Sequence, residues 1–126
     1  MKSKEPYKIS FFIPGLPRTT NSGGRAHWAM KAKEARFWKN CVHLVTVGKR
    51  PESPLKKARL TLVRYSSAEC DFDGLVSSFK HVIDGLKDSG IIENDKQANL
   101  PDPKYLWEKA PPKKGQVFIA VEEIRE

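Results

Sequence analysis

The sequence has little of what marks secreted, membrane-spanning or zinc-binding proteins. Its 126 residues include only two cysteines, Cys41 and Cys70, and no Cys-x-x-Cys spacing typical of a zinc site. No apolar run approaches the roughly 18 residues that a membrane span requires. The first ten residues, MKSKEPYKIS, lack the apolar stretch of a signal peptide. We therefore expect an intracellular, cytoplasmic protein with free thiols and no membrane partner.

Acidic residues are scarce in the first half of the chain. Residues 1–60 contain 14 Lys or Arg and 3 Asp or Glu, a net charge of +11, whereas residues 61–126 contain 9 and 12, a net charge of −3. The whole chain is 39% hydrophobic and 30% charged, as in ordinary folded domains. A strongly basic half is typical of proteins that bind nucleic acids. A merely solvated surface is the alternative interpretation.

Hydrophobic periodicity predicts one α+β domain over residues 1–126. Two-residue alternation predicts strands, and three-to-four-residue spacing predicts helices. The expected strands cover residues 7–13, 58–65, 104–108 and 117–121, and the expected helices cover residues 28–47 and 73–89. This order, β-α-β-α-β-β, favours a mixed sheet of about four strands with two helices packed on it.

The first expected helix carries both an apolar stripe and basic side chains. The stripe, which we expect to face the core, consists of Met30, Phe37, Trp38, Cys41, Val42 and Val45. Basic residues of the helix and of the Gly- and Pro-rich loop before it are candidates for contacts with DNA phosphates. These candidates are Arg18, Arg25, Lys31, Lys33, Arg36 and Lys39.

Carboxylates cluster around the second expected helix. Asp71 and Asp73 are two residues apart, so in extended backbone both side chains point to one side. Lys80 lies on the polar side of the helix, and Asp95 follows its end. Oxygen ligands of this kind suit Mg²⁺, which binds a few carboxylates together with water and substrate phosphate. Such an ion polarises a phosphodiester, and a lysine offsets developing negative charge.

Each of these residues also has an ordinary structural interpretation. Asp71 or Asp73 is a good helix N-cap. Lys80 and Asp84 are four residues apart and suit an exposed ion pair. Asp95, in the run Glu93-Asn94-Asp95, suits a turn. Spacing alone does not decide between these interpretations and a metal site.

Residues 71–95 resemble the RusA family of Holliday junction resolvases. The family pattern is D-x-D-N, a helical lysine, D-A-L, G and D-D. The corresponding residues here are Asp71-Phe72-Asp73-Gly74-Leu75, Lys80, Asp84-Gly85-Leu86, Gly90 and Asn94-Asp95. The N-terminal run Ile13-Pro14-Gly15-Leu16-Pro17, followed by Asn21, Arg25 and a basic helix, is also similar, so the likeness extends over nearly the whole chain. Two departures from the pattern matter, since Gly74 replaces Asn and Asn94 replaces the first Asp of the last pair.

The resemblance implies a small homodimeric endonuclease of a bacterial or phage-infected cell. It implies Mg²⁺ as cofactor, with Mn²⁺ as a substitute, and no small-molecule cofactor. It also implies symmetric cleavage of four-way DNA junctions during recombination and repair. Asp71, Asp73 and Asp95 would be the metal-binding catalytic acids, and Lys80 the catalytic lysine. Two alternatives stay open: a structure-specific DNA-binding protein of the same fold that has lost cleavage, and a protein that binds another protein through its basic face.

Overall fold

The computed structural model of the protein describes residues 5–17 and 25–125. The elements are β1 (Lys8–Pro14), α1 (Arg25–Val45), β2 (Ala58–Ser66), α2 (Phe72–Ser78), α3 (Lys80–Asp88), β3 (Lys104–Lys109) and β4 (Gln116–Glu123). The predicted α+β domain and its order of elements are confirmed, with the second helix in two segments. Within the described ranges, no helix combines the length and apolar character that a membrane span needs.

The four strands form one mixed sheet in the order β1-β4-β2-β3. Strand β4 lies between β1 and β2 and is antiparallel to both, whereas β2 and β3 are parallel. The parallel pair is connected through α2 and α3, because parallel neighbours require a crossover. This connection places α2 directly after one end of β2, where the carboxylate-rich segment begins.

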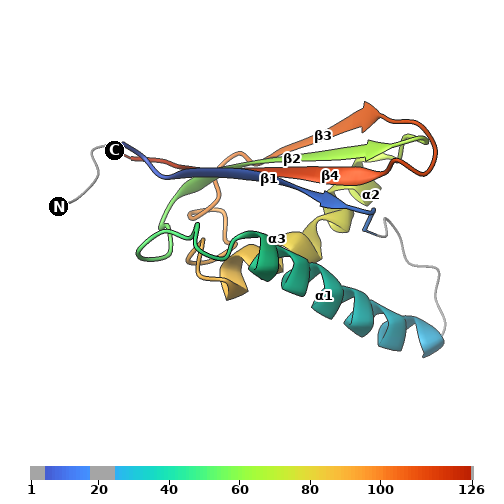
Figure 1. Cartoon of the computed structure of the whole chain (residues 1–126), viewed down its shortest axis with the longest axis horizontal. Coiled ribbons are helices and arrows are strands. Elements are labelled where there is room, and N and C mark those ends of the chain that lie inside the picture. The colour runs from blue at the N-terminus through green and yellow to red at the C-terminus, as the bar shows by residue number, and fades with distance from the viewer. Residues whose placement is uncertain (1–4, 18–24, 126) are drawn as a thin grey trace.

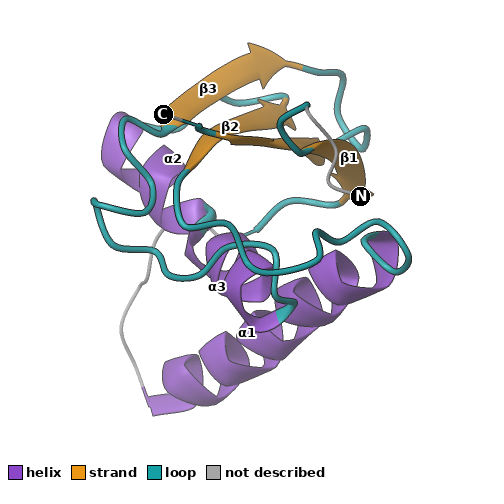
Figure 2. Cartoon of the chain, turned by 90° about the vertical axis from the view of Figure 1, so that its left-hand side faces the viewer, coloured by secondary structure: helices purple, strands orange, loops and turns teal. Residues whose placement is uncertain are grey.

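All described helices lie on one face of the sheet, as Figures 1 and 2 show. The side chains that point from the sheet toward the helices are apolar and almost fully buried. The core combines Ile13, Leu60, Leu62, Val117, Ile119 and Val121 of the sheet with Trp38, Val42, Phe79, Val82 and Leu86 of the helices. Burial of this contiguous cluster is the main source of stability for a domain of this size.

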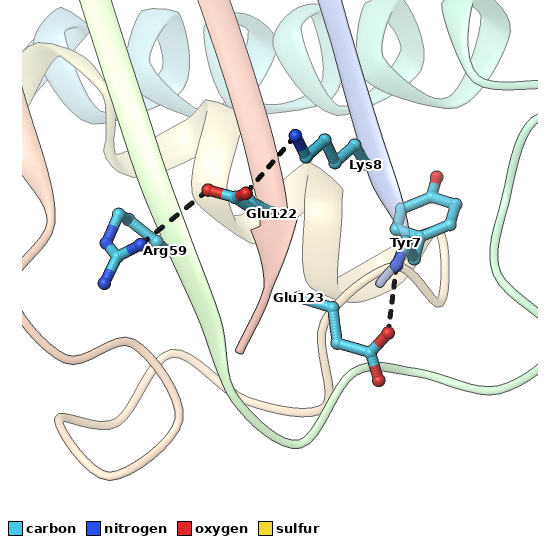
Figure 3. A network of polar contacts seen from close by, with 5 residues as sticks. All are labelled: Tyr7, Lys8, Arg59, Glu122 and Glu123. Carbon is cyan, nitrogen blue, oxygen red and sulfur yellow. Dashed lines mark hydrogen bonds and ion pairs between the residues drawn. The ribbon is translucent and has the colours of Figure 1, made fainter. Parts of the chain in front are cut away.

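The other face of the sheet is not covered by any described helix. At one end of this face, Glu122 of β4 forms ion pairs with Lys8 of β1 (3.5 Å) and Arg59 of β2 (3.7 Å), as Figure 3 shows. These three side chains are largely exposed, so each pair contributes little to stability. The three residues lie directly opposite one another on neighbouring strands, so the ion pairs fit the observed strand register.

The second predicted helix is divided at Phe79, which corrects the expectation of one continuous helix. The hydroxyl of Ser77 donates to the carbonyl of Gly74 (3.1 Å), and that of Ser78 donates to the carbonyl of Leu75 (2.7 Å). Such bonds compete with the helical backbone pattern and bend helices. Phe79 then adopts φ −94° and ψ 1°, outside regular helix geometry, and α3 starts in a new direction.

Helix α1 packs on α3 with a different stripe from the predicted one. Trp38 and Val42 are buried, as expected, but Met30 and Phe37 are 46% and 54% exposed. Phe37 precedes Trp38 by one residue, so it projects about 100° away and covers only the edge of the Trp38 ring. Gly85 of α3 allows the close approach, because a Cβ there would lie 3.0 Å from the Cβ of Val42.

Candidate functional site

Asp71 is the N-cap of α2, which confirms its predicted structural interpretation. Its carboxylate oxygen Oδ1 accepts a hydrogen bond from the backbone N–H of Gly74 at 2.9 Å. The Asp71 backbone is extended, and its carbonyl accepts the first helical bond from Leu75. Capping uses one oxygen of the exposed carboxylate and leaves the other to a further partner.

Aromatic residues at the two ends of α2 contact the sheet. Phe72 meets Tyr105 of β3 edge to face, with ring centroids 6.5 Å apart, and Phe79 meets the same ring at 6.2 Å. Asp73 is exposed in the first turn of α2. Tyr105 therefore holds the start of α2, with Asp71 and Asp73 on either side of Phe72.

A pocket of about 460 Å³ brings Lys80 and Asp95 together. Its lining comprises Val76, Ser77, Lys80, Ile83, Asp95, Gln97, Leu100, Pro103 and Tyr105. Lys80 comes from the first turn of α3, and Asp95 from the segment between α3 and β3. A cation and a carboxylate separated by 15 positions in the sequence thus share one concave surface, which also includes the Tyr105 side chain that anchors α2.

The hydrogen-bonding states of these groups follow from their surroundings. Burial raises the pKa of the half-buried Tyr105 phenol, so it stays protonated and able to donate a hydrogen bond at neutral pH. Lys80 is exposed and forms no ion pair among the described residues, so the predicted alternative of a Lys80–Asp84 pair is not observed. The N–H of Asp95 donates to the side-chain oxygen of Asn94 at 2.8 Å.

His81 of α3 is a partly buried imidazole within electrostatic reach of charged residues of α1. Burial lowers the pKa of the His81 imidazole, and the carboxylates of Asp84 and Glu34 oppose that shift. Lys80 of α3 and Lys31 of α1 both add to it. Charged side chains of both α1 and α3 therefore influence this one imidazole.

The six basic residues predicted to contact DNA phosphates have different surroundings, and not all of them are described by the structure. Lys31, Lys33 and Arg36 are exposed on α1. Lys39 forms an ion pair with Asp88 of α3 at 3.3 Å, so it also joins the two helices. Arg18 lies outside the described residues, and Arg25 is described only as the first residue of α1.

The predicted three-carboxylate metal site is not preformed. Among residues 5–17 and 25–125, no group of three or more His, Cys, Asp or Glu side chains is arranged to hold a metal ion. Asp95 lines the pocket, while Asp71 caps α2 and Asp73 occupies its first turn. The described residues therefore do not fit a closed cage, and the metal-ligand roles of these three aspartates stay predictions.

Two side chains at this end of the sheet were not predicted as functional. Tyr105 belongs to a predicted strand, but its contacts with α2 depend on the crossover, which strand periodicity does not specify. Arg64 follows Leu60 and Leu62 on the inward face of β2 and is 8% exposed. A charged residue at an inward position of a strand is unusual, and this placement could have been noticed in the sequence.

The two roles of Asp71 are separable by a pair of substitutions. Asp71→Asn keeps a good N-cap, so we expect the free energy of unfolding to change by a few tenths of a kcal/mol. Asp71→Ala removes the cap and should destabilise by about 1 kcal/mol. Urea denaturation measures both values. Equal stability of the two variants would show that the bond to Gly74 contributes nothing.

Comparison with known proteins assigns the chain to no family. No protein-family model matches it, and no curated protein matches it in sequence.

Proposed function

We propose that the protein is a metal-dependent endodeoxyribonuclease that cleaves four-way DNA junctions. The observation that supports this most is the shared pocket of Lys80 and Asp95, whose lining includes Tyr105, the residue that contacts Phe72 between Asp71 and Asp73. The exposed basic residues of α1 supply a surface for the DNA backbone, on a helix that lies on the same face of the sheet as α3.

The residues of the pocket have distinct proposed tasks. The Lys80 ammonium, which has no ion-pair partner in the described part of the chain, binds a phosphate oxygen and offsets negative charge that develops during cleavage. The proposed task of Tyr105, which lines the same pocket and whose phenol stays protonated, is to donate a hydrogen bond to the substrate. Asp73 and Asp95 are exposed carboxylates available to a cation.

The metal is proposed from these donors and not from a formed cage. Mg²⁺ usually takes one or two protein carboxylates and completes its shell with water and substrate phosphates. When bound, it would supply polarisation of the phosphodiester and orientation of a water molecule. Mn²⁺ would serve in its place, and no small-molecule cofactor is required.

The second candidate is a structure-specific DNA-binding protein that has lost cleavage. The missing three-carboxylate group among the described residues favours it, as does Gly74 in place of an amide side chain. Titration with Mn²⁺ followed by calorimetry separates the two candidates. Heat release that disappears in Asp95→Asn supports the nuclease, and no heat at all supports the binding protein.

We further propose a homodimer in the cytoplasm of a bacterial or phage-infected cell. Two copies would present two pockets, one for each cut of a symmetric junction. Analytical ultracentrifugation measures the mass of the protein in solution. A mass of one chain, for both the free protein and the protein bound to the junction, would rule out the homodimer.

The contribution of α1 to DNA binding is measurable through its salt dependence. Replacing Lys31, Lys33 and Arg36 with Gln removes three candidate phosphate contacts. We expect the slope of log K against log salt concentration to become less steep by about three units, since each contact contributes about 0.9. Fluorescence anisotropy with a labelled junction measures the slope at several salt concentrations.

A matched control removes the same charge from the uncovered face of the sheet. Lys8, Arg59 and Lys104 point to that face, opposite the helices. Their replacement with Gln lowers the net charge equally but should leave the slope almost unchanged. Equal effects of the two triple variants would contradict a specific DNA surface on α1.

A further inference from the structure

Arg64 is a buried cation that forms no ion pair with any residue described by the structure. Its side chain is 8% exposed on the inward face of β2. Nη1 donates to the backbone carbonyl of Pro17 at 2.6 Å, and Nε is buried without a hydrogen-bond partner among the described residues. Burial lowers the pKa of the guanidinium, and only the nearby Cys70 thiol opposes this shift. Arginine nonetheless stays protonated in proteins, so the charge is present.

The surroundings of Arg64 explain neither the charge nor the free donor. In its row across the sheet, the register partners are Val117 of β4 and Trp107 of β3, which are apolar or aromatic. The Trp107 indole N–H donates to the Ser66 hydroxyl, and that hydroxyl donates to the Ala68 carbonyl. The neighbouring polar groups thus satisfy one another and leave Arg64 Nε out.

Burial of an unpaired charge opposes folding, because the charge loses its hydration and gains no counter-charge. A residue that lowers stability in this way is typically found where a function requires it. Arg64 also lies close to the end of β2, two residues before Ser66. The chain then reaches Asp71, the cap of α2, within five residues of that strand end.

We propose that Arg64 is a phosphate-binding residue beside the start of α2. The planar guanidinium presents two N–H groups side by side, which matches two oxygens of a phosphate. Nε is the donor left unsatisfied among the described residues, since Nη1 is bonded to Pro17. The anion subsite stands on this geometry alone. Its assignment to a backbone phosphate of DNA rests on the proposed nuclease function.

The test uses inorganic phosphate and the whole chain. Phosphate should raise the thermal unfolding midpoint above that in chloride at equal ionic strength, by mass action on the folded state. Arg64→Met should lose most of this increment and should be at least as stable as the wild type in chloride. Lys33→Met, which removes an exposed cation of α1, should keep the increment. Retention of the increment in Arg64→Met overturns the proposal.

A second measurement needs no variant and covers the case in which Arg64→Met does not fold. The Nε–H resonance of Arg64 in the wild-type protein should shift in a saturable manner during phosphate titration. No shift at phosphate concentrations that raise the unfolding midpoint overturns the subsite.

Junction binding then tests the source of the phosphate. We expect Arg64→Met to weaken junction affinity about tenfold, as loss of one charged bidentate contact would. Unchanged affinity in a variant that has lost the phosphate increment overturns the DNA assignment. That result would leave junction cleavage by the wild type, and hence the nuclease proposal, as a separate question.

Discussion

Lys80→Gln is expected to slow junction cleavage by about 100-fold to 1,000-fold, the usual loss when one donor to a developing negative charge is removed. Lys80 is exposed, lines the pocket with Asp95 and has no ion-pair partner in the described part of the chain. Its replacement should therefore change the free energy of unfolding by less than about 0.5 kcal/mol. Single-turnover cleavage of a labelled junction at saturating protein measures the chemical step apart from binding.

The matched control for Lys80 is Lys87→Gln. Lys87 is exposed in the last turn of the same helix and does not line the pocket. The Lys87→Gln variant should cleave the junction at the wild-type rate. A loss of cleavage rate equal to that of Lys80→Gln would point to a general effect of charge.

Asp73→Asn tests the same site with the opposite charge. Removal of a negative charge does not weaken attraction to phosphates, so the junction should bind at least as tightly as to the wild type. Cleavage, in contrast, should be abolished. A variant that binds poorly and cuts normally would assign Asp73 to the fold and not to the chemistry.

Phe79→Ala is expected to have the largest effect on stability, about 3–5 kcal/mol. Phe79 is fully buried, links α2 to α3 and packs against Tyr105. Truncation leaves a cavity at the joint that orients α3, so Lys80, the next residue, would also lose its fixed position. Urea denaturation gives the free energy of unfolding, and an unchanged m-value would confirm that the native state stays compact.

Phe72→Ala provides the comparison on the same segment. Phe72 contacts the same tyrosine ring but is 66% exposed. Its truncation should cost about 1 kcal/mol or less, since little apolar surface leaves a buried site. An equal loss of stability in the two variants would contradict the conclusion that Phe79, and not Phe72, is the buried residue that stabilises this segment.

Local patterns in the sequence were enough to predict the four strands. Each strand shows a two-residue alternation or an aromatic run, and the observed strands lie within two residues of the predicted bounds. The division at Phe79 was missed because it depends on hydroxyl-to-carbonyl bonds from Ser77 and Ser78. The exposure of Phe37 was missed because the sequence does not specify which side of α1 meets α3.

Tertiary contacts decide the arrangement of the candidate site, so the sequence predicted its members better than its geometry. Lys80 and Asp95 share a pocket because the chain returns past α3 before β3. Asp71 was predicted both as a cap and as a ligand, and the structure shows the cap. The contacts of Tyr105 and the isolation of Arg64 arise from strand pairing and the crossover, which residue spacing does not reveal.

The most direct measurement is cleavage of a labelled four-way junction by the wild-type protein, beside a linear duplex of the same sequence. With Mg²⁺ or Mn²⁺, we expect paired cuts in opposing strands of the junction, products that DNA ligase can seal and no cutting of the duplex. Chelation of the metal should stop the reaction while binding persists. A junction that is bound but stays intact with both metals would contradict the nuclease and leave a DNA-binding protein in its place.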